Sequence, residues 1–148
     1  MDAIQKVRES RENSNRAATK KLADFPTLFG EIRQPDSNYL LIPRTSSENR
    51  RYIPIGFMPP TVIASNAATI IPNATLYHFG VLTSNVHNSW MRAVAGRLKS
   101  DYRYSGSVVY NNFPWPNPTD EQKAKIEKTA QAILDARALF PDSSLADL

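Results

Sequence analysis

The fold is decided by residues 83–116, TSNVHNSWMRAVAGRLKSDYRYSGSVVYNNFPWP, which hold a helix start, a helix end and a strand pattern in one run. The helical pattern spans residues 76–98, and Thr83 or Ser84 can cap a helix within it, because either hydroxyl can accept from the first turn. Gly96 equally allows that helix to end earlier. The side predicted to be buried carries Val86, Trp90, Val94 and Leu98, and the opposite side carries Asn85, Asn88, Arg92 and Lys99. Residues 107–113, SVVYNNF, predict a strand.

Shorter elements surround this run. Residues 3–24 predict one helix, and short strands are expected at 39–43, 52–58, 62–65 and 69–72, which Pro43, Pro54, Pro59 and Pro60 keep irregular. Residues 114–118 form a stiff linker, and Thr119-Asp120-Glu121-Gln122 is a capping box that opens a helix ending before Pro141. We therefore predict an α+β fold of short irregular strands with a helix at each end. The predicted segments are 1–30 (helix and linker), 31–118 (the central domain) and 119–148 (C-terminal helical segment).

Composition and charge exclude several classes of protein. The 148 residues contain no cysteine and two histidines, which removes disulfides, thiolate metal sites and a cysteine nucleophile. No apolar run is long enough to span a membrane, so we expect a cytoplasmic protein without a membrane partner. Of the net charge of +4, a surplus of four basic groups falls in residues 31–110. That surplus favours a polyanion partner, although a solvated basic face would look the same.

The chemistry of cofactor enzymes is missing from the chain. Its five glycines are scattered, so there is no glycine-rich loop that could hold a nucleotide or a related cofactor. Pro35-Asp36 and Glu121-x-Lys123 superficially resemble a metal-dependent nuclease motif, but the capping box already explains Glu121 and Lys123. The aromatic residues Trp90, Tyr110 and Phe113 are best read as core.

The segment Lys99-Ser100-Asp101-Tyr102-Arg103 carries the most specific chemistry. In extended backbone, Lys99, Asp101 and Arg103 would point the same way, because side chains alternate along a strand. A lysine can donate to the two major-groove acceptors of guanine, and an aspartate can accept from the amino group of the paired cytosine. One Lys/Asp pair could therefore read a G·C pair. The alternative is a surface salt bridge worth about 0–1 kcal/mol.

Long stretches of the chain resemble one family. Residues 9–26, ESRENSNRAATKKLADFP, and residues 52–116, with GRLKSDYRYS (96–105) followed by VYNNFPWP (109–116), are similar to the target recognition region of MmeI-like single-chain restriction–modification enzymes. The resemblance covers residues 7–140. It implies a DNA-recognition domain from an adenine-specific DNA methyltransferase that uses S-adenosylmethionine. The family's Asn-Pro-Pro-aromatic catalytic motif and its cofactor loop are absent here. We therefore expect a chain that binds DNA without methylating it, with the cofactor held elsewhere in the parent enzyme.

The resemblance also implies which side chains read bases. Matching the segments places base-reading side chains at Arg44, Asn66, Ala67, Lys99, Asp101 and Arg103. From the basic surplus we expect phosphate contacts at Arg50, Arg51, Arg92 and Arg97. The expected partners are double-stranded DNA and the methyltransferase catalytic domain of the parent protein.

Two other functions compete with DNA recognition. The first is a protein–protein interaction domain, in which VYNNFPWP docks a partner and the basic face is incidental. The second is a small metal-dependent hydrolase, which the capping box makes a poor fit. Salt dependence separates DNA recognition from protein docking, because phosphate contacts weaken steeply as salt rises.

Overall fold

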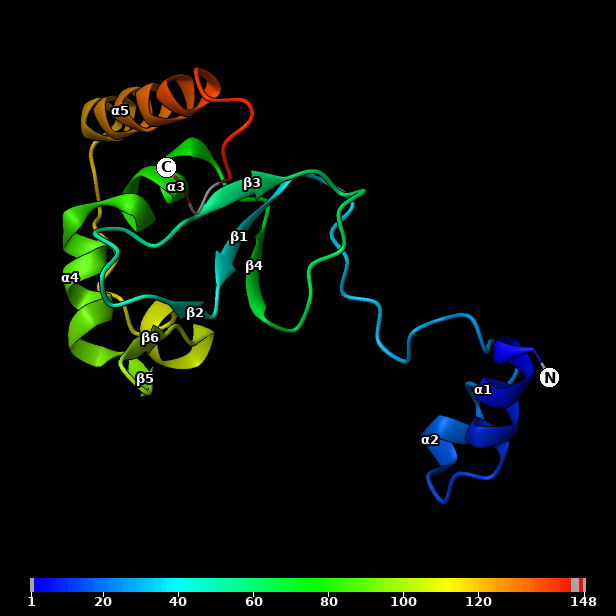
Figure 1. Ribbon diagram of the computed structural model, residues 1–148. Helices are drawn as coiled ribbons and strands as arrows, with labels where there is room; N and C mark the ends of the chain where they lie inside the picture. Colours follow the sequence, from blue (N-terminus) through cyan, green and yellow to red (C-terminus); the bar gives the residue numbers. More distant parts are fainter. Residues whose placement is uncertain (1, 145–146, 148) are drawn as a thin grey trace. The chain divides into compact units, whose positions relative to one another are not determined.

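The computed structural model describes residues 2–144 and residue 147. The chain divides into two compact units, Met1–Arg33 and Gln34–Leu148 (Figure 1). Unit 1 contains α1 (Ala3–Glu12) and α2 (Ala17–Lys20). Unit 2 contains every described strand and the remaining helices. The prediction of an α+β fold with short strands and helices at both ends is confirmed.

The prediction of a single helix over residues 3–24 is wrong, because unit 1 contains two separate helices. The helix stops at Glu12, and the Ser14 hydroxyl accepts from the backbone N–H of Arg16 before α2 begins. Short polar side chains such as serine favour turns in this way over helix interiors. The Arg11 guanidinium then ties the unit together, because it donates to the carbonyls of Leu22, Phe25 and Leu28 at 2.7–2.9 Å.

Unit 2 is built on two small antiparallel sheets. The first has the order β3-β1-β4 and the second the order β2-β6-β5. The strands are β1 (Tyr39–Pro43), β2 (Thr45–Ser46), β3 (Gly56–Met58), β4 (Ala68–Pro72), β5 (Gly96–Leu98) and β6 (Asp101–Arg103). The predicted strands at 39–43 and 69–72 are confirmed, whereas only the end of 52–58 is a strand and 62–65 is none.

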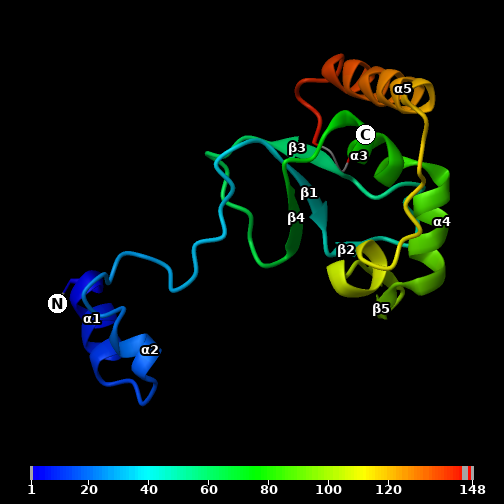
Figure 2. The ribbon, with the colours of Figure 1, turned by 180° about the vertical axis from the view of Figure 1, so that it is seen from behind.

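Helices cover the first sheet on one side. They are α3 (Leu76–Thr83), α4 (Asn85–Val94) and α5 (Asp120–Ala138), and both ribbon views show α5 lying along α3 (Figures 1 and 2). The capping box at the start of α5 is present as predicted, since Thr119 and Gln122 exchange hydrogen bonds. The core between sheet and helices consists of Leu40, Ile42, Ile53, Ile55, Phe79, Leu82, Met91, Tyr104, Val109 and Ala130.

Helix α4 begins where predicted but turns a different face inward. Ser84 caps it by accepting from the backbone N–H of His87, which confirms one of the two predicted caps. However, Val86 is 70% exposed, while Asn88 is 1% exposed. The Asn88 side chain accepts from the N–H of Ile53 and donates to the carbonyls of Thr83 and Ser84. A buried amide with its partners satisfied is stable in a core, and an amphipathic pattern cannot reveal that.

The predicted strand at 107–113 is wrong. Residues Gly106–Tyr110 form a π-helical turn whose Val109 is fully buried. The Trp90 indole donates to the carbonyl of Val109 at 2.9 Å, and the Asn112 amide donates to two further carbonyls of the turn. The contact from Trp90 of α4 and the local contacts of Asn112 together override the strand preference of the two valines. The prediction that Trp90, Tyr110 and Phe113 are core is confirmed for Phe113, which is buried, whereas Trp90 and Tyr110 are half-buried and pack against the core.

His87 is a fully buried histidine beside this turn. Its Nε2 lies 3.1 Å from the Tyr104 hydroxyl and its ring packs edge-on against Phe113, while Nδ1 has no partner among the described residues. Burial lowers the pKa of His87 to about 4, from 6.5 in an unfolded chain. The unfolded chain therefore binds a proton at higher pH than the folded one, and stability is lost as the pH falls from 6.5 toward 4.

We expect the free energy of unfolding to be about 2 kcal/mol lower at pH 5 than at pH 7.5, at 1.36 kcal/mol per pKa unit. Urea unfolding at the two pH values measures this difference. His87→Gln is the control, because glutamine does not titrate and its pH dependence should be smaller by the same amount. An equal loss of stability in both proteins would show that another group is responsible.

Candidate nucleic-acid interface

The most informative site residues lie on the hairpin formed by β5 and β6. Lys99 and Ser100 are its two-residue turn, because Leu98 pairs with Asp101. Lys99 has a φ of 57°, in the left-handed region that favours glycine. The expected extended row from Lys99 to Arg103 is therefore wrong at its first member. A left-handed lysine costs about 1–2 kcal/mol, so the rest of the hairpin must hold it in place.

Side chains of the second sheet divide between two faces. Strand pairing places Arg97, Tyr102 and Ser46 on one face, where Tyr102 packs against the core. Alternation then places the side chains of Asp101 and Arg103 on the outward face, together with Leu98 and Thr45. Asp101 and Arg103 are separated by about 7 Å along the strand, close to two base-pair steps of DNA.

Arg44 joins this sheet to the other one. Its N–H donates to the carbonyl of Ala67 at 2.9 Å, and its own carbonyl accepts from the N–H of Tyr104 at 2.7 Å. Asn66 and Ala67 lie at the exposed apex of a turn that the Ala68 N–H closes by donating to Ser65. Arg44 therefore lies between the Asn66–Ala67 turn and the end of β6.

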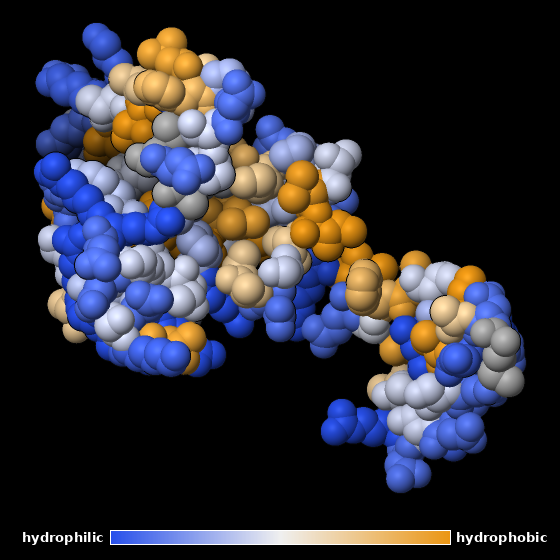
Figure 3. Space-filling model, in the orientation of Figure 1, coloured by the Kyte–Doolittle hydropathy of each residue, from blue (hydrophilic) through white to orange (hydrophobic). Residues whose placement is uncertain are grey.

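These contacts bring the predicted base-reading residues onto one edge of unit 2. The segment before β4 and the hairpin of β5 and β6 lie at the same, lower edge in both ribbon views (Figures 1 and 2). Arg44, Asn66, Ala67, Lys99 and Arg103 are exposed, and Asp101 is half-buried. In the space-filling view the surface over β5 and β6 is mostly hydrophilic (Figure 3).

The four predicted phosphate-contacting arginines are associated with the loop between β2 and β3: Arg50 and Arg51 belong to it, and Arg92 and Arg97 contact it. Arg92 donates from α4 to the carbonyls of Arg50 and Arg51, at 3.1 and 2.6 Å, and so holds this loop on the helix. Arg97 lies 3.8 Å from the carboxylate of Glu48 in the same loop. Arg92 and Arg97 therefore support the backbone as well as carrying charge.

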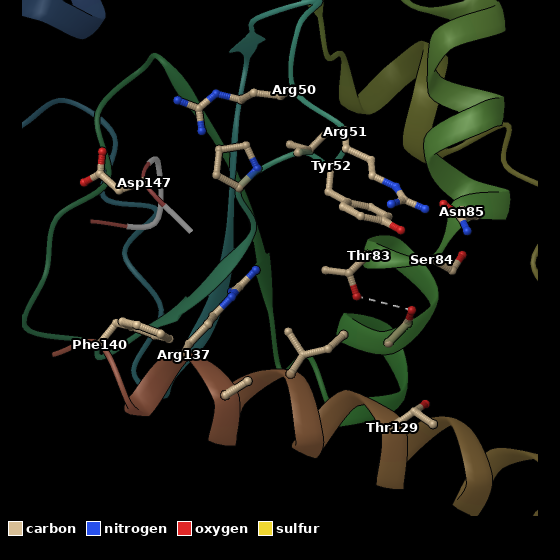
Figure 4. A pocket seen from close by; sticks show the side chains of 15 residues that line it. Arg50, Arg51, Tyr52, Thr83, Ser84, Asn85, Thr129, Arg137, Phe140 and Asp147 are labelled. Atoms are coloured by element: carbon tan, nitrogen blue, oxygen red, sulfur yellow. Dashed lines mark hydrogen bonds between the residues drawn. The ribbon is translucent and has the colours of Figure 1, made fainter. Parts of the chain in front are cut away.

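Arg50 and Arg51 also line a cavity of about 800 Å³. Figure 4 shows them with Ser84 and Asn85 on one side, and Arg137 and Phe140 from the end of α5 on the other. Arg137 donates to the carbonyl of Ile55 at 2.7 Å and so ties α5 to the loop that leads into β3.

Metal-binding clusters and membrane-spanning helices are both lacking among the described residues. Among the described residues, no three His, Cys, Asp or Glu side chains lie close enough to hold a metal ion. Glu121 of the nuclease-like motif pairs with Lys125 at 2.6 Å on the surface of α5. No helix in the described part of the chain has the length and apolar character needed to cross a bilayer.

Sequence reasoning missed Thr45, Glu48 and Leu98. The N–H of Glu48 donates to Asp101 Oδ1 at 3.4 Å, and Leu98 is 51% exposed opposite Asp101. Nothing in the sequence shows that β2 pairs with β6, so Thr45 and Glu48 could not be associated with the hairpin. Leu98 could have been found only by placing the hairpin turn at residues 99–100.

Comparison with known proteins gives consistent matches over the chain. Residues 1–117 match the family described as MmeI, target recognition domain, and residues 118–148 match MmeI, C-terminal domain. The chain is 42% identical over 127 residues to DNA methyltransferase A of Bacillus subtilis (strain 168), a match that covers 86% of this chain and 14% of that protein.

A solved structure of the Type IIL restriction–modification enzyme MmeI in complex with DNA has the same fold. The TM-score is 0.85 at 54% sequence identity, and the match covers 97% of this chain and 19% of that one. The chain thus spans less than a fifth of the length of either relative. The chain belongs to the MmeI target recognition domain family, and it continues into a segment of the MmeI C-terminal domain family.

Proposed function

We propose that this chain reads the DNA target sequence for a restriction–modification DNA methyltransferase. One observation carries the proposal: residues separated by up to 59 positions, from Arg44 to Arg103, are brought to one edge by the pairing of β2 with β6 and of Arg44 with Ala67. Their donor and acceptor groups suit base edges, and the match to an enzyme solved with DNA supports the same role.

Each candidate reader has a chemistry that fits a groove contact. Lys99 donates to guanine and Asp101 accepts from cytosine, whereas Arg103, two residues along β6, reaches a different base pair. Asn66 and Arg44 can each form paired hydrogen bonds with a purine. Ala67 is small, so it admits a base edge or touches a thymine methyl group. Arg50, Arg51 and Arg92 are the proposed phosphate contacts. Arg97, expected from the sequence to be a fourth, has its guanidinium engaged by Ser100, Tyr102 and Glu48 instead.

The parent enzyme supplies the chemistry of methyl transfer. We propose that it is an adenine-specific enzyme of the cytoplasm, that its catalytic domain holds S-adenosylmethionine, and that this chain alone transfers no methyl group. The described residues do not fit that cofactor, because their glycines are scattered along the chain and form no glycine-rich loop. Gly80 packs against α5 instead, where Ile126 and Ala130 lie 2.8 and 3.1 Å from the position that a Cβ would take. Residues 31–118 carry the reading face, between the segments 1–30 and 119–148.

We expect the isolated chain to bind duplex DNA weakly and with a steep dependence on salt. The basic surplus in residues 31–110 supplies phosphate contacts, and non-specific affinities are roughly micromolar or weaker. Fluorescence anisotropy with a labelled duplex at 50–200 mM salt measures the affinity and its salt dependence. Over this range phosphate-mediated binding falls by orders of magnitude.

The control is a chain in which Arg50 and Arg51 are both replaced by glutamine, which should reduce the salt dependence. Absence of binding to any duplex at low salt would contradict the proposal. Salt-independent binding would instead favour a protein-docking domain.

A further inference from the structure

The guanidinium of Arg97 contacts two other residues of the hairpin that carries Lys99 and Asp101. Its Nη1 donates to the carbonyl of Ser100 at 2.7 Å. Its Cζ lies 3.8 Å from the centre of the Tyr102 ring, directly across the strand pair. One planar group therefore contacts both the turn and the ring that anchors the hairpin to the core.

Glu48 completes this arrangement from the neighbouring segment. Its carboxylate lies 3.8 Å from Arg97, and its backbone N–H donates to Asp101 Oδ1 at 3.4 Å. With Oδ1 engaged by Glu48, Oδ2 is the oxygen left to accept from a cytosine amino group. The contact thus restrains the Asp101 side chain.

The turn requires such support because Lys99 occupies left-handed backbone. A two-residue turn of this kind ordinarily has glycine at its first position. The hydrogen bond from Arg97 to Ser100 restrains the second turn residue and, through it, the backbone on both sides. Without that bond the tip would sample other turn geometries, and Lys99 and Asp101 would no longer present a fixed donor and acceptor.

We propose that Arg97 is a positioning residue for sequence reading, which fixes the geometry of Lys99 and Asp101 by joining the Ser100 carbonyl to the Tyr102 ring. The inference rests on the proposed function and deepens it. Arg97 then determines how sharply one base pair is discriminated. A phosphate contact at the same residue would instead strengthen binding to all sequences equally.

Arg97→Lys in the complete methyltransferase carrying this chain tests the proposal. Lysine keeps the charge for a phosphate but lacks the planar fork that stacks on Tyr102 and reaches Ser100. We expect the ratio of kcat/KM between the preferred base pair and the other three, at the position read by Lys99 and Asp101, to fall about tenfold. Ratios at other positions and the salt dependence of binding should not change.

Amide exchange followed by mass spectrometry gives a readout that is independent of activity. The peptide covering residues 97–103 should exchange faster in the Arg97→Lys enzyme, because the turn is less restrained. Arg137→Lys is the matched control: Arg137 also donates to a backbone carbonyl, that of Ile55, and lies over a ring, that of Phe79, but it is not on the hairpin. This change should alter neither the discrimination nor the exchange of residues 97–103.

Two results would overturn the proposal. One is wild-type discrimination in Arg97→Lys. The other is an equal loss of binding affinity for all duplexes in Arg97→Ala, together with a slope of log affinity against log salt that is smaller by about one. That combination identifies a phosphate contact. Exchanging the charges of Lys99 and Asp101 in the same assay distinguishes failure of the positioning role of Arg97 from failure of the proposed function. If that exchange shifts the target while Arg97→Lys does not, only the positioning role fails; if the exchange changes nothing, the proposed function fails.

Discussion

Replacing Lys99 by Glu and Asp101 by Arg together is expected to reverse the base pair preferred at one position of the target. The arginine then donates to guanine from the side that held the aspartate, and the glutamate accepts from cytosine on the other strand. Each good contact is worth about 1–3 kcal/mol of discrimination, or roughly ten- to a hundredfold. The methylation site profile of the complete enzyme carrying the double change measures the result.

Single changes provide the controls for this reversal. Lys99→Glu alone leaves two acceptors facing a base pair that offers one donor, so activity should fall without a new preference. Arg103→Ala should relax a different position, because Arg103 lies about two base-pair steps along β6. If the double change leaves every position of the target unaltered, Lys99 and Asp101 do not read bases.

Local signals in the sequence predicted the elements whose causes are local. The hydroxyls of Ser84 and Thr119 cap helices because each can reach an N–H within three residues, and both contacts are present. The strand at 39–43 is an apolar run that becomes the central strand of its sheet. The α+β class followed from the order of such elements.

Predictions failed where tertiary contacts decide the structure. Asn88 is buried because Ile53, far away in the sequence, donates to its side chain. Residues 107–113 leave the strand conformation because the Trp90 indole of α4 satisfies a carbonyl of a π-helical turn, which the Asn112 amide also stabilises from within the segment. Neither partner could be identified from the spacing of apolar residues.

The candidate site shows the same division. The resemblance of GRLKSDYRYS to one family supplied the residue identities, but a wrong backbone was assumed at Lys99. The gathering of Arg44 with Ala67 and Arg103 depends on strand pairing, which no motif expresses. The supporting role of Arg97 was hidden for the same reason, because its partners Tyr102 and Glu48 are brought to it by pairing across two strands.

Gly80→Leu is expected to lower the free energy of unfolding by about 3 kcal/mol, the upper end of the range for overpacking a core. Gly80 lies on the face of α3 that packs on α5, where a Cβ would stand 2.8 Å from Ile126 Cγ2 and 3.2 Å from the carbonyl oxygen of Ile126. That backbone atom cannot move without shifting α5. Urea unfolding at pH 7.5 measures the loss of stability.

Gly96→Ala is the matched control, because a Cβ there meets no atom within 4 Å and the backbone φ is not left-handed. Its stability should change by no more than about 0.5 kcal/mol. The contrast also tests whether the two family segments pack against each other. Gly80 belongs to the segment that matches the target recognition domain, and Ile126 belongs to the segment that matches the C-terminal domain. A leucine at residue 80 that left stability unchanged would mean that α3 and α5 do not pack closely, and that the C-terminal segment contributes little to the fold of the reading face.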